Sequence, residues 1–400
     1  MDTSDQDHDH HQLSFRAVFM ATLLDQLGAA FLWPLITIYI NEYLHRSLTV
    51  AGIVLLLVSI AMVAGNLLGG RLFDHWKPYP TLIGAAILAV LSTAVLIWDH
   101  SWPWFAVLLI VNAFADGIIA TVVNAYAAAT ARQGARAAFN TLYIAVNLGI
   151  VFGTLLVGVL LPISAPLVFA VATGAYGLLL LVCIVAFRGP IILRRQRRPR
   201  HQRGVKLSAP QHRRNQSVVL VACACLASVY LGYALWESIM PAHMTHLGIP
   251  FVFYSFLWTF NGLMIICCQP LVNVLGARIR IDHQIESGVL LFGVSFLMLV
   301  GAHNFWMILL AFIIATVGDM LSLPAVPAWI DQLTPASQRG KYQGLPSIAM
   351  SVGRSVGPLY GGVLVDHGNY AVLFISVAAL ILGLLVALVI IARRQQLTRE

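Results

Sequence analysis

Four acidic side chains occur inside long stretches that are otherwise almost entirely apolar. They are Asp25, Asp116, Glu237 and Asp319. An acid in an apolar environment is costly, by roughly 2.5–3.5 kcal/mol on membrane-insertion scales, so it usually faces a cavity or a polar partner. A buried carboxyl group can bind a proton on one side of a barrier and release it on the other. These four residues therefore predict proton coupling; the alternative for each is a structural hydrogen bond to a neighbouring helix.

Further polar and aromatic residues accompany these acids. Arg354, in the segment SVGRSVGP, is a basic residue in apolar surroundings, and we expect one of the four acids to pair with it. Aromatic and amide side chains in the same stretches predict an adaptable pocket for lipophilic molecules, although each could instead pack in the core or against lipid. The predicted substrate-binding residues are Gln26, Trp33, Tyr230, Trp236, Phe260, Asn261, Asp319 and Glu237.

The composition shows what surrounds these residues. Of the 400 residues, 59% are hydrophobic and 10% are charged, and the mean hydropathy is +0.84. A soluble globular protein has about 25% charged residues. Apolar runs of about 20 residues, the length that a helix needs to cross a bilayer, recur along nearly the whole chain. The sequence therefore predicts a helical protein that crosses a membrane many times.

Polar breaks divide these runs into twelve predicted membrane helices, which makes the expected fold all-α. A basic segment at 189–216 is predicted to be a solvated linker that also contacts anionic lipid headgroups. We expect a tail at 1–13, a six-helix half at 14–188, the linker, a second six-helix half at 217–392 and a tail at 393–400. The helices are expected near 14–41, 48–73, 80–98, 102–129, 137–161, 166–188, 217–241, 252–276, 286–303, 305–331, 341–365 and 370–392.

The net charge of +8 comes from basic residues that lie between the apolar runs. Such a distribution is a topology signal, and it argues against a nucleic-acid partner. With twelve alternating spans, nearly all of these residues fall on the side of the linker. Because cytoplasmic loops are rich in Lys and Arg, both termini and the linker are predicted to be cytoplasmic, in the inner membrane of a bacterium.

The two predicted halves repeat one pattern. Asp116 is followed twenty residues later by Arg136, and Asp319 is followed twenty residues later by Arg339. Three glycines of the fifth predicted helix recur in the eleventh, and this shared order of residues indicates a duplication. Transporters built from two such pseudo-symmetric halves bind substrate between them near the middle of the membrane. The paired glycines are Gly149, Gly153 and Gly158 in the first half and Gly353, Gly357 and Gly362 in the second.

Small residues at intervals of four let helices approach closely, and Pro358 loosens its helix. We therefore predict a pliable interface between the fifth and eleventh helices that allows the halves to rock; the alternative is tight packing alone. The residues assigned to conformational change on this basis are Gly149, Gly153, Gly353, Gly357 and Pro358, together with Arg354 and the repeated Arg136 and Arg339.

Two segments resemble motifs of the major facilitator superfamily. GGRLFDHWKPYP is similar to the family's loop between the second and third helices, with Gly70, Leu72 and Asp74 at matching positions. GRSVGPLYGG is similar to the glycine–proline motif of its antiporters. The resemblance covers the chain from about Phe15 to the last helix and implies that Gly70 and Asp74 take part in conformational change. From its position alone, Asp74 would be a charge at the membrane edge.

Within that family, the chain resembles proton-coupled multidrug efflux antiporters of the LmrP type. VGDMLSLPAVPAWIDQLTPASQRGKYQG is similar to their tenth helix and the loop after it, and WESIMPAHM is similar to the end of their seventh helix. The resemblance implies that Asp319 is a membrane-embedded carboxylate of proton coupling or cationic drug binding. It also implies that Glu237 is a second functional acid.

The expected function is export of lipophilic drugs, including cationic ones, by a proton-coupled transporter with alternating access. We expect small lipophilic substrates, protons and membrane lipids as partners, a monomeric chain, and no cofactor beyond the proton gradient. Three alternatives are a proton-coupled sugar or metabolite transporter, a lipid or glycolipid flippase, and a membrane enzyme. The sequence shows no metal-ligand cluster, nucleophile elbow or phosphate-binding loop, which disfavours an enzyme, a metal site or an ATP-driven pump.

Overall fold

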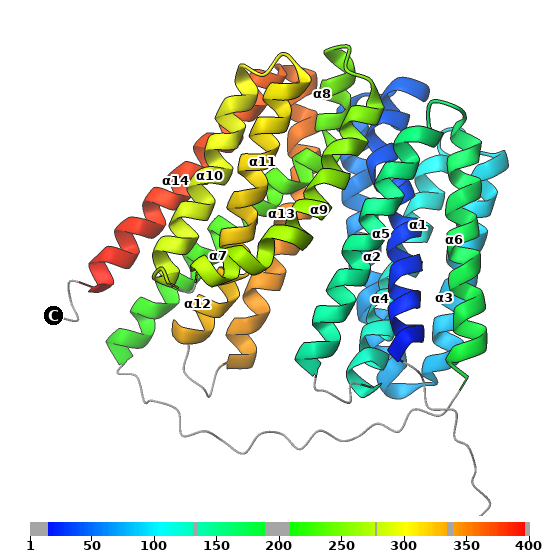
Figure 1. Ribbon diagram of the computed structural model, residues 1–400, viewed down its shortest axis with the longest axis horizontal. Coiled ribbons are helices and arrows are strands. Elements are labelled where there is room, and N and C mark those ends of the chain that lie inside the picture. The colour runs from blue at the N-terminus through cyan, green and yellow to red at the C-terminus, as the bar shows by residue number, and fades with distance from the viewer. Residues whose placement is uncertain (1–14, 131–134, 189–208, 277, 334–338, 397–400) are drawn as a thin grey trace, which may run out of the picture. The chain divides into compact units, whose positions relative to one another are not determined.

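The computed structural model describes residues 15–130, 135–188, 209–276, 278–333 and 339–396, and every regular element within these ranges is a helix (Figure 1). The elements of the first half of the sequence are α1 (Phe15–Ile38), η1 (Tyr39–Tyr43), α2 (Leu48–His75), α3 (Pro78–Trp98), α4 (Trp104–Thr130), α5 (Ala135–Leu160) and α6 (Ala165–Ala186). Those of the second half are α7 (Ala209–Ser238), α8 (Met240–His246), α9 (Phe251–Gly276), α10 (Ile281–Val300), α11 (Phe305–Ser322), α12 (Ala325–Leu333), α13 (Arg339–His367) and α14 (Tyr370–Gln396).

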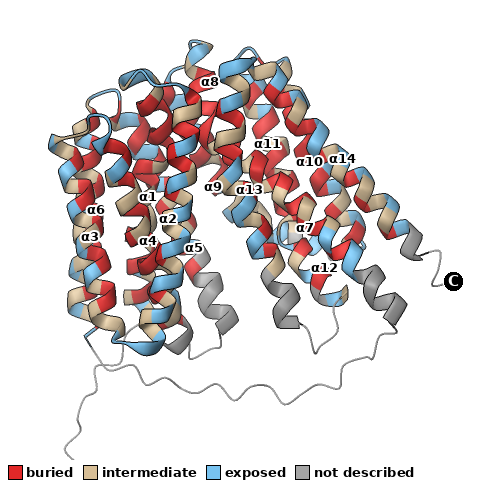
Figure 2. Ribbon diagram, turned by 180° about the vertical axis from the view of Figure 1, so that it is seen from behind, coloured by how far each residue is buried: buried red, intermediate tan, exposed pale blue. Residues whose placement is uncertain are grey.

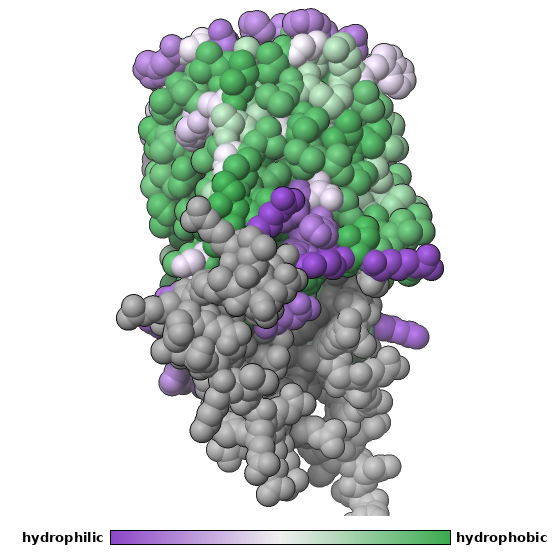
Figure 3. Space-filling view, turned by 90° about the vertical axis from the view of Figure 1, so that its left-hand side faces the viewer, coloured by the Kyte–Doolittle hydropathy of each residue, from purple (hydrophilic) through white to green (hydrophobic). Residues whose placement is uncertain are grey.

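The predicted all-α membrane architecture is confirmed. Among the described residues, eleven helical segments are long and apolar enough to cross a membrane, and Ile144–Leu160 of α5 is a shorter apolar helix. The outward surfaces carry large apolar side chains such as Leu67, Leu178 and Val185. One face of the molecule shows a broad apolar band with hydrophilic residues along its upper rim (Figure 3).

Several helix boundaries differ from the sequence prediction. The helix expected at 305–331 is split into α11 and α12 next to Pro324, which has no backbone N–H to donate and so weakens a helix at that point. At the start of α11, the side chain of Asn304 accepts a hydrogen bond from the backbone of Met307 at 3.0 Å, which caps the helix. The seventh helix begins at Ala209 instead of near residue 217, within the segment predicted to be linker.

The chain forms two compact units that do not coincide with the two halves of the sequence. The first unit comprises the described residues of Met1–Leu32, Ile60–Gly153 and Ile163–Arg197, and the second comprises those of Trp33–Ser59, Thr154–Pro162 and Arg198–Glu400. Helices α1, α2 and α5 therefore each contribute residues to both units. The prediction of two six-helix halves joined by a linker concerns sequence duplication, and this division of contacts does not test it.

Each unit has its own buried core. In the first unit, α3 packs against α4 and α6, with Ala115, Val122, Tyr176 and Leu179 among the buried residues. In the second unit, α10 packs against α11 and α14, and α13 packs against α7. Buried residues lie along the sides of the helices that face one another, and exposed residues lie on the outward sides (Figure 2).

The glycines of α5 allow it to lie directly against α1. A Cβ atom added to Gly149 would lie 2.7 Å from the Cβ atom of Gln26, and one added to Gly153 would lie 2.5 Å from the Cβ atom of Ala30. Real side chains are not found at such distances, so the contact requires glycine. These two positions therefore set how closely the first and fifth helices approach.

The equivalent glycines of α13 perform the same role against α7. A Cβ atom on Gly357 would lie 2.7 Å from the backbone oxygen of Leu231, and Gly353 contacts the backbone of Ala227. The same packing thus recurs in both halves of the sequence. The expected interface between the fifth and eleventh helices is corrected here, because these four glycines contact the first and seventh helices of their own halves.

Candidate functional site

An ion pair within the second unit joins α7 to α13. The Nη2 atom of Arg354 donates to the Oε1 atom of Glu237 at 2.6 Å, and 40% of the arginine side chain and 16% of the glutamate side chain are exposed. The glycines of α13 bring this pair together because they let α13 lie on α7. Pro358 lies one turn after Arg354 and has no N–H to donate to its carbonyl group, so the helix is loosened there. The expectation that one of the four acids pairs with Arg354 is confirmed.

Aromatic rings surround the guanidinium group of Arg354. Its central carbon lies 4.8 Å from the ring centroid of Trp33 and 5.9 Å from that of Tyr233, both within the range of a cation–π interaction. Tyr233 in turn contacts Trp258 edge-on at 5.4 Å and Tyr230 at 6.1 Å. Trp33 comes from α1, so residues of both sequence halves meet at this arginine within one compact unit.

Part of the charge pair has no hydrogen-bond partner among the described residues. The Oε2 atom of Glu237 and the Nε atom of Arg354 are both buried and unpartnered. The hydroxyl group of Tyr254 donates to the backbone oxygen of Glu237 at 2.8 Å, which fixes the position of α7 but leaves this carboxylate oxygen unused. Buried polar atoms are normally paired, so these two atoms keep unused hydrogen-bonding capacity among the described residues.

Asp319 lies in α11 of the same unit. Its side chain is buried, and its Oδ1 atom has no hydrogen-bond partner in the described structure. Asp319 interacts electrostatically with Tyr233, which links it to the aromatic group around Arg354. One turn earlier in α11, the hydroxyl group of Thr316 accepts a hydrogen bond from the side chain of Asn261 at 2.9 Å. Within the part of the chain that the structure describes, Asp319 therefore has no cationic counterpart of the kind that Glu237 has.

The other predicted substrate residues lie in different surroundings. Trp236 is fully buried against Phe312, with ring centroids 4.7 Å apart, so it contributes to the core of the second unit. Phe260 is half-buried and stacks against Phe256 at 6.2 Å. Gln26 is half-buried in α1, in the first unit, beside Gly149.

The first unit contains a second buried polar group, around Asp116. The hydroxyl group of Tyr176 lies 3.1 Å from Asp116 Oδ2 and 3.4 Å from Asn112 Oδ1. The side-chain amide of Asn112 donates to the hydroxyl group of Ser92 at 3.4 Å. Asp25 is buried nearby and interacts electrostatically with Asp116, and the Oδ1 atoms of both acids are unpartnered among the described residues. The structure thus brings Asp25 and Asp116 together in one cluster.

The sequence prediction missed several residues of these two groups, although a helical spacing marks some of them. Tyr233 precedes Glu237 by four positions, and Asn112 precedes Asp116 by four, so each pair lies on one helix face. Searching one turn away from each acid would have found both residues. Tyr176 and Trp258 come from other helices, and no sequence spacing connects them to the acids.

The predicted conformational residues at the linker side are less fully described. Asp74 is exposed in the last turn of α2, and Gly70 lies near Thr121 of α4, where an added Cβ atom would be 3.8 Å from a methyl carbon. Arg136 and Arg339 lie outside the residues whose side chains the structure describes. The roles of all four remain predictions.

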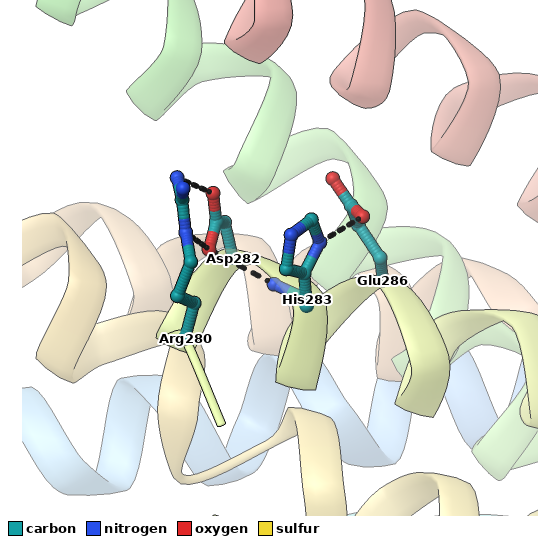
Figure 4. A network of polar contacts seen from close by, with 4 residues as sticks. All are labelled: Arg280, Asp282, His283 and Glu286. Atoms are coloured by element: carbon teal, nitrogen blue, oxygen red, sulfur yellow. Dashed lines mark hydrogen bonds and ion pairs between the residues drawn. The ribbon is translucent and has the colours of Figure 1, made fainter. Parts of the chain in front are cut away.

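A network of charged side chains lies at the start of α10 (Figure 4). Arg280 donates to both carboxylate oxygens of Asp282, at 2.8 and 3.2 Å, and His283 Nδ1 lies 3.0 Å from Glu286 Oε2. The hydrogen bond and charge of Asp282 raise the pKa of Arg280. The network lies at the start of a predicted span, where charged residues commonly mark the edge of the membrane.

Comparison with known proteins agrees with this fold. A sequence model of the Major Facilitator Superfamily matches residues 18–285 and 223–400. The chain is similar to the MFS-type transporter YttB of Bacillus subtilis, with 35% identity over 372 residues that make up 92% of each protein. It is also similar, at 24% identity over 163 residues, to 42% of the quinolone resistance protein NorA of Staphylococcus aureus, a match that covers 41% of this chain.

The solved structures that resemble this chain agree in fold alone. A crystal structure of the peptide transporter POT in complex with sulfate has a TM-score of 0.79 and 15% identity, covering 98% of this chain and 96% of its own. The POT family transporter PepTSo has a TM-score of 0.76 and 14% identity over 96% of this chain and 98% of its own. The expected fold class is confirmed, and the chain belongs to the Major Facilitator Superfamily, as a multi-pass membrane transporter and not an enzyme.

Proposed function

We propose that this transporter exports lipophilic drugs, including cationic ones, in exchange for protons, as an LmrP-type multidrug antiporter does. Two acids of the second unit carry the proposal: Asp319, a buried carboxylate with no basic partner among the described residues, and Glu237, a carboxylate paired to an arginine that lies against aromatic rings. Aromatic faces attract lipophilic and cationic groups, and an unpaired buried carboxylate supplies the charge that a cation needs.

The two acids then have different roles. The charge of Glu237 is already balanced by Arg354, so a cationic substrate is drawn mainly to Asp319. A proton that reaches Asp319 removes its negative charge, which weakens the binding of the cation and favours its release. A proton that reaches Glu237 weakens the link between α7 and α13, because the ion pair loses its charge complementarity. Protonation would thus promote both substrate release and return of the empty carrier.

The partial similarity to NorA supports efflux, because NorA is a quinolone resistance protein. The protein would act in the inner membrane of a bacterium, with both termini and the basic linker in the cytoplasm and the proton gradient as its sole energy source. It would act as a monomer, with its surface in contact with membrane lipids.

Dye transport in inverted membrane vesicles tests the proposal. With an imposed proton gradient, the wild-type chain should accumulate a lipophilic cationic dye, and Asp319→Asn and Glu237→Gln should each lower the rate at least tenfold. Glu286→Gln is the matched control, because Glu286 belongs to the charged network at the start of α10 (Figure 4). Transport by Asp319→Asn and Glu237→Gln at the wild-type rate would reject the assigned residues.

The alternatives give different results in the same system. A proton-coupled sugar or metabolite transporter would move a polar solute together with protons and would not accumulate the dye. A flippase would transfer labelled lipid headgroups between leaflets of liposomes and would confer no drug resistance. A drug-susceptibility panel in a host without its own efflux pumps therefore separates the three functions.

A further inference from the structure

The hydroxyl group of Tyr176 has two hydrogen-bond acceptors but carries one hydrogen. It lies 3.1 Å from Asp116 Oδ2 and 3.4 Å from Asn112 Oδ1. A tyrosine hydroxyl donates a single hydrogen bond while its oxygen can accept others. Which of the two oxygens receives the hydrogen therefore depends on the state of Asp116.

Two arrangements satisfy this group. When Asp116 is ionised, its carboxylate accepts the hydrogen of Tyr176, because a charged acceptor forms the stronger bond. When Asp116 is protonated, the acid donates to the tyrosine oxygen, and Tyr176 turns its own hydrogen to Asn112. The amide of Asn112 in turn donates to Ser92 Oγ at 3.4 Å, and that hydroxyl group donates to the backbone oxygen of Ala89 at 3.0 Å.

We propose that Tyr176 and Asn112 form a relay that transmits the protonation state of Asp116 from α4 to α6 and α3. The inference rests on the proposed proton coupling and adds Tyr176 and Asn112 to it as positioning residues, which act through Asp116 and do not touch the substrate. Because the three helices pack together around this cluster, a change of hydrogen-bond direction in it acts on the contacts between them.

The surroundings of the cluster suit a switch of this kind. Tyr176, Asn112, Asp116 and Ser92 are all buried, so the cluster is sheltered from competing solvent. Gly28 of α1 lies directly against the tyrosine ring, where an added Cβ atom would be 2.7 Å from Cε2. The ring is thereby held in place while its hydroxyl hydrogen remains free to rotate.

The titratable groups that act on this cluster come from α1 and from α6 itself. Asp25 of α1 interacts electrostatically with Asp116 and Tyr176, and Cys183 of α6 interacts with Asp25. Two neighbouring carboxyl groups in an apolar site do not both ionise readily, so Asp25 and Asp116 compete for a proton. The direction of the Tyr176 hydrogen bond then depends on whether Asp116 or Asp25 holds the proton.

Infrared difference spectroscopy of the purified full-length protein tests the relay without any substrate. The absorption of protonated carboxyl groups is followed as a function of pH, and the band that Asp116→Asn removes is assigned to Asp116. Asn112→Leu, which is nearly isosteric, removes an acceptor that is used only when Asp116 is protonated. It should move the midpoint of this band to lower pH by roughly half a unit to one unit, the value of one neutral hydrogen bond.

A double-mutant cycle identifies Tyr176 as the link. In a Tyr176→Phe background, Asn112→Leu should produce no further shift, because the relay is already interrupted between the two residues. In a Tyr126→Phe background, the shift should persist, since Tyr126 is another buried tyrosine of the same unit that packs on Phe187. If Asn112→Leu does not fold, Ser92→Ala replaces it, because it removes the group that orients the amide of Asn112.

An unshifted midpoint in Asn112→Leu, or a shift that survives Tyr176→Phe unchanged, overturns the relay. Dye transport by the same proteins separates this inference from the proposed function. The double-mutant cycle can give the expected shifts while the wild-type chain accumulates no dye in vesicles with an imposed proton gradient. In that case the relay is supported and drug export is rejected.

Discussion

The Oε1 atom of Glu237 lies 2.6 Å from the Nη2 atom of Arg354, and the same guanidinium group lies 4.8 Å from the ring centroid of Trp33. Arg354 of α13 thus contacts both α7 and α1, the first helix of the chain. In a transporter that must rearrange these helices, a contact that depends on charge can be broken by a proton, whereas an apolar contact cannot.

Breaking this pair from one side should destabilise the protein more than removing it altogether. Arg354→Gln leaves the carboxylate of Glu237 without its cation and should cost about 1–2 kcal/mol. This is less than the roughly 3–5 kcal/mol of a fully buried pair, because 40% of the arginine side chain is exposed. The double variant with Glu237→Gln should recover most of that loss. Thermal unfolding in detergent measures both variants, and strictly additive losses would contradict the pairing.

Much of the fold was predictable from the sequence because a membrane restricts the possible structures. Apolar runs of spanning length predicted the helices, and most boundaries agree with the structure to within a few residues. The exceptions have local causes. Pro324 splits one predicted helix, and Pro241 stands at the start of the short helix α8, most of which lies beyond the predicted seventh span at 217–241.

The candidate site was predictable only in part, because hydropathy identifies an unusual residue but not its neighbours. The four acids stood out as charges in apolar stretches, and Arg354 was expected to pair with one of them. Its partner could not be chosen from the sequence, since the choice depends on how α13 lies on α7. Tyr176 was missed for a related reason: a tyrosine in an apolar helix is ordinary until its hydroxyl group is seen 3.1 Å from Asp116.

The contact between α5 and α1 should be intolerant of even one added methyl group. Gly149→Ala would place a carbon 2.7 Å from Gln26 Cβ and 2.9 Å from the backbone oxygen of Leu23, so one helix must move. We expect a loss of about 1–3 kcal/mol in the free energy of unfolding, as for other overpacked cores. Thermal unfolding in detergent measures the loss.

Gly174→Ala is the matched control for this substitution. Gly174 lies within α6 and has nothing within 4 Å of an added Cβ atom. Because alanine is the better helix former, the change should stabilise the protein by roughly 0.5–1 kcal/mol. If both variants change stability in the same direction, the space around Gly149 does not control the contact.

Asp366 should hold the beginning of α2 in place from the end of α13. Its two carboxylate oxygens accept the backbone N–H groups of Leu48 at 3.2 Å and Thr49 at 2.7 Å, which would otherwise be unsatisfied at the helix N-terminus. Asp366→Ala should cost about 1–2 kcal/mol, and Asp366→Asn less, because the amide oxygen still accepts one bond. Hydrogen exchange measured by mass spectrometry should show faster exchange in peptides that contain Leu48 and Thr49.

Asp99→Ala provides the comparison for that experiment. The carboxylate of Asp99 accepts hydrogen bonds from the backbone and side chain of Ser101, at 3.1 and 2.6 Å, within its own loop, and these bonds lower its pKa. Asp99→Ala removes these bonds, so it should speed hydrogen exchange near residue 101 and leave hydrogen exchange at the start of α2 unchanged. Unchanged exchange at Leu48 and Thr49 in Asp366→Ala would show that the carboxylate does not hold α2.

His243 should make the protein less stable as the pH falls below neutrality. Its ring is buried in α8 against Tyr370 and Phe374, at 4.3 and 5.2 Å, and neither ring nitrogen has a hydrogen-bond partner among the described residues. Burial, followed by the charges of His246 and His303, lowers the pKa of His243 to about 4 from a usual value of 6.5. The neutral ring is therefore the form that the fold accepts.

The sign of the effect follows from proton binding. Between pH 6.5 and about 4 the unfolded chain binds a proton at His243 that the folded chain does not. The stabilisation is complete above pH 6.5 and is lost as the pH falls through this window, by on the order of 2–3 kcal/mol. His243→Phe keeps the aromatic packing and should flatten the dependence of Tm on pH in this range. His283→Gln changes an exposed ring and should leave the dependence of Tm on pH as steep as in the wild-type protein. Equal slopes for wild-type protein and His243→Phe would mean that another group destabilises the fold in acid.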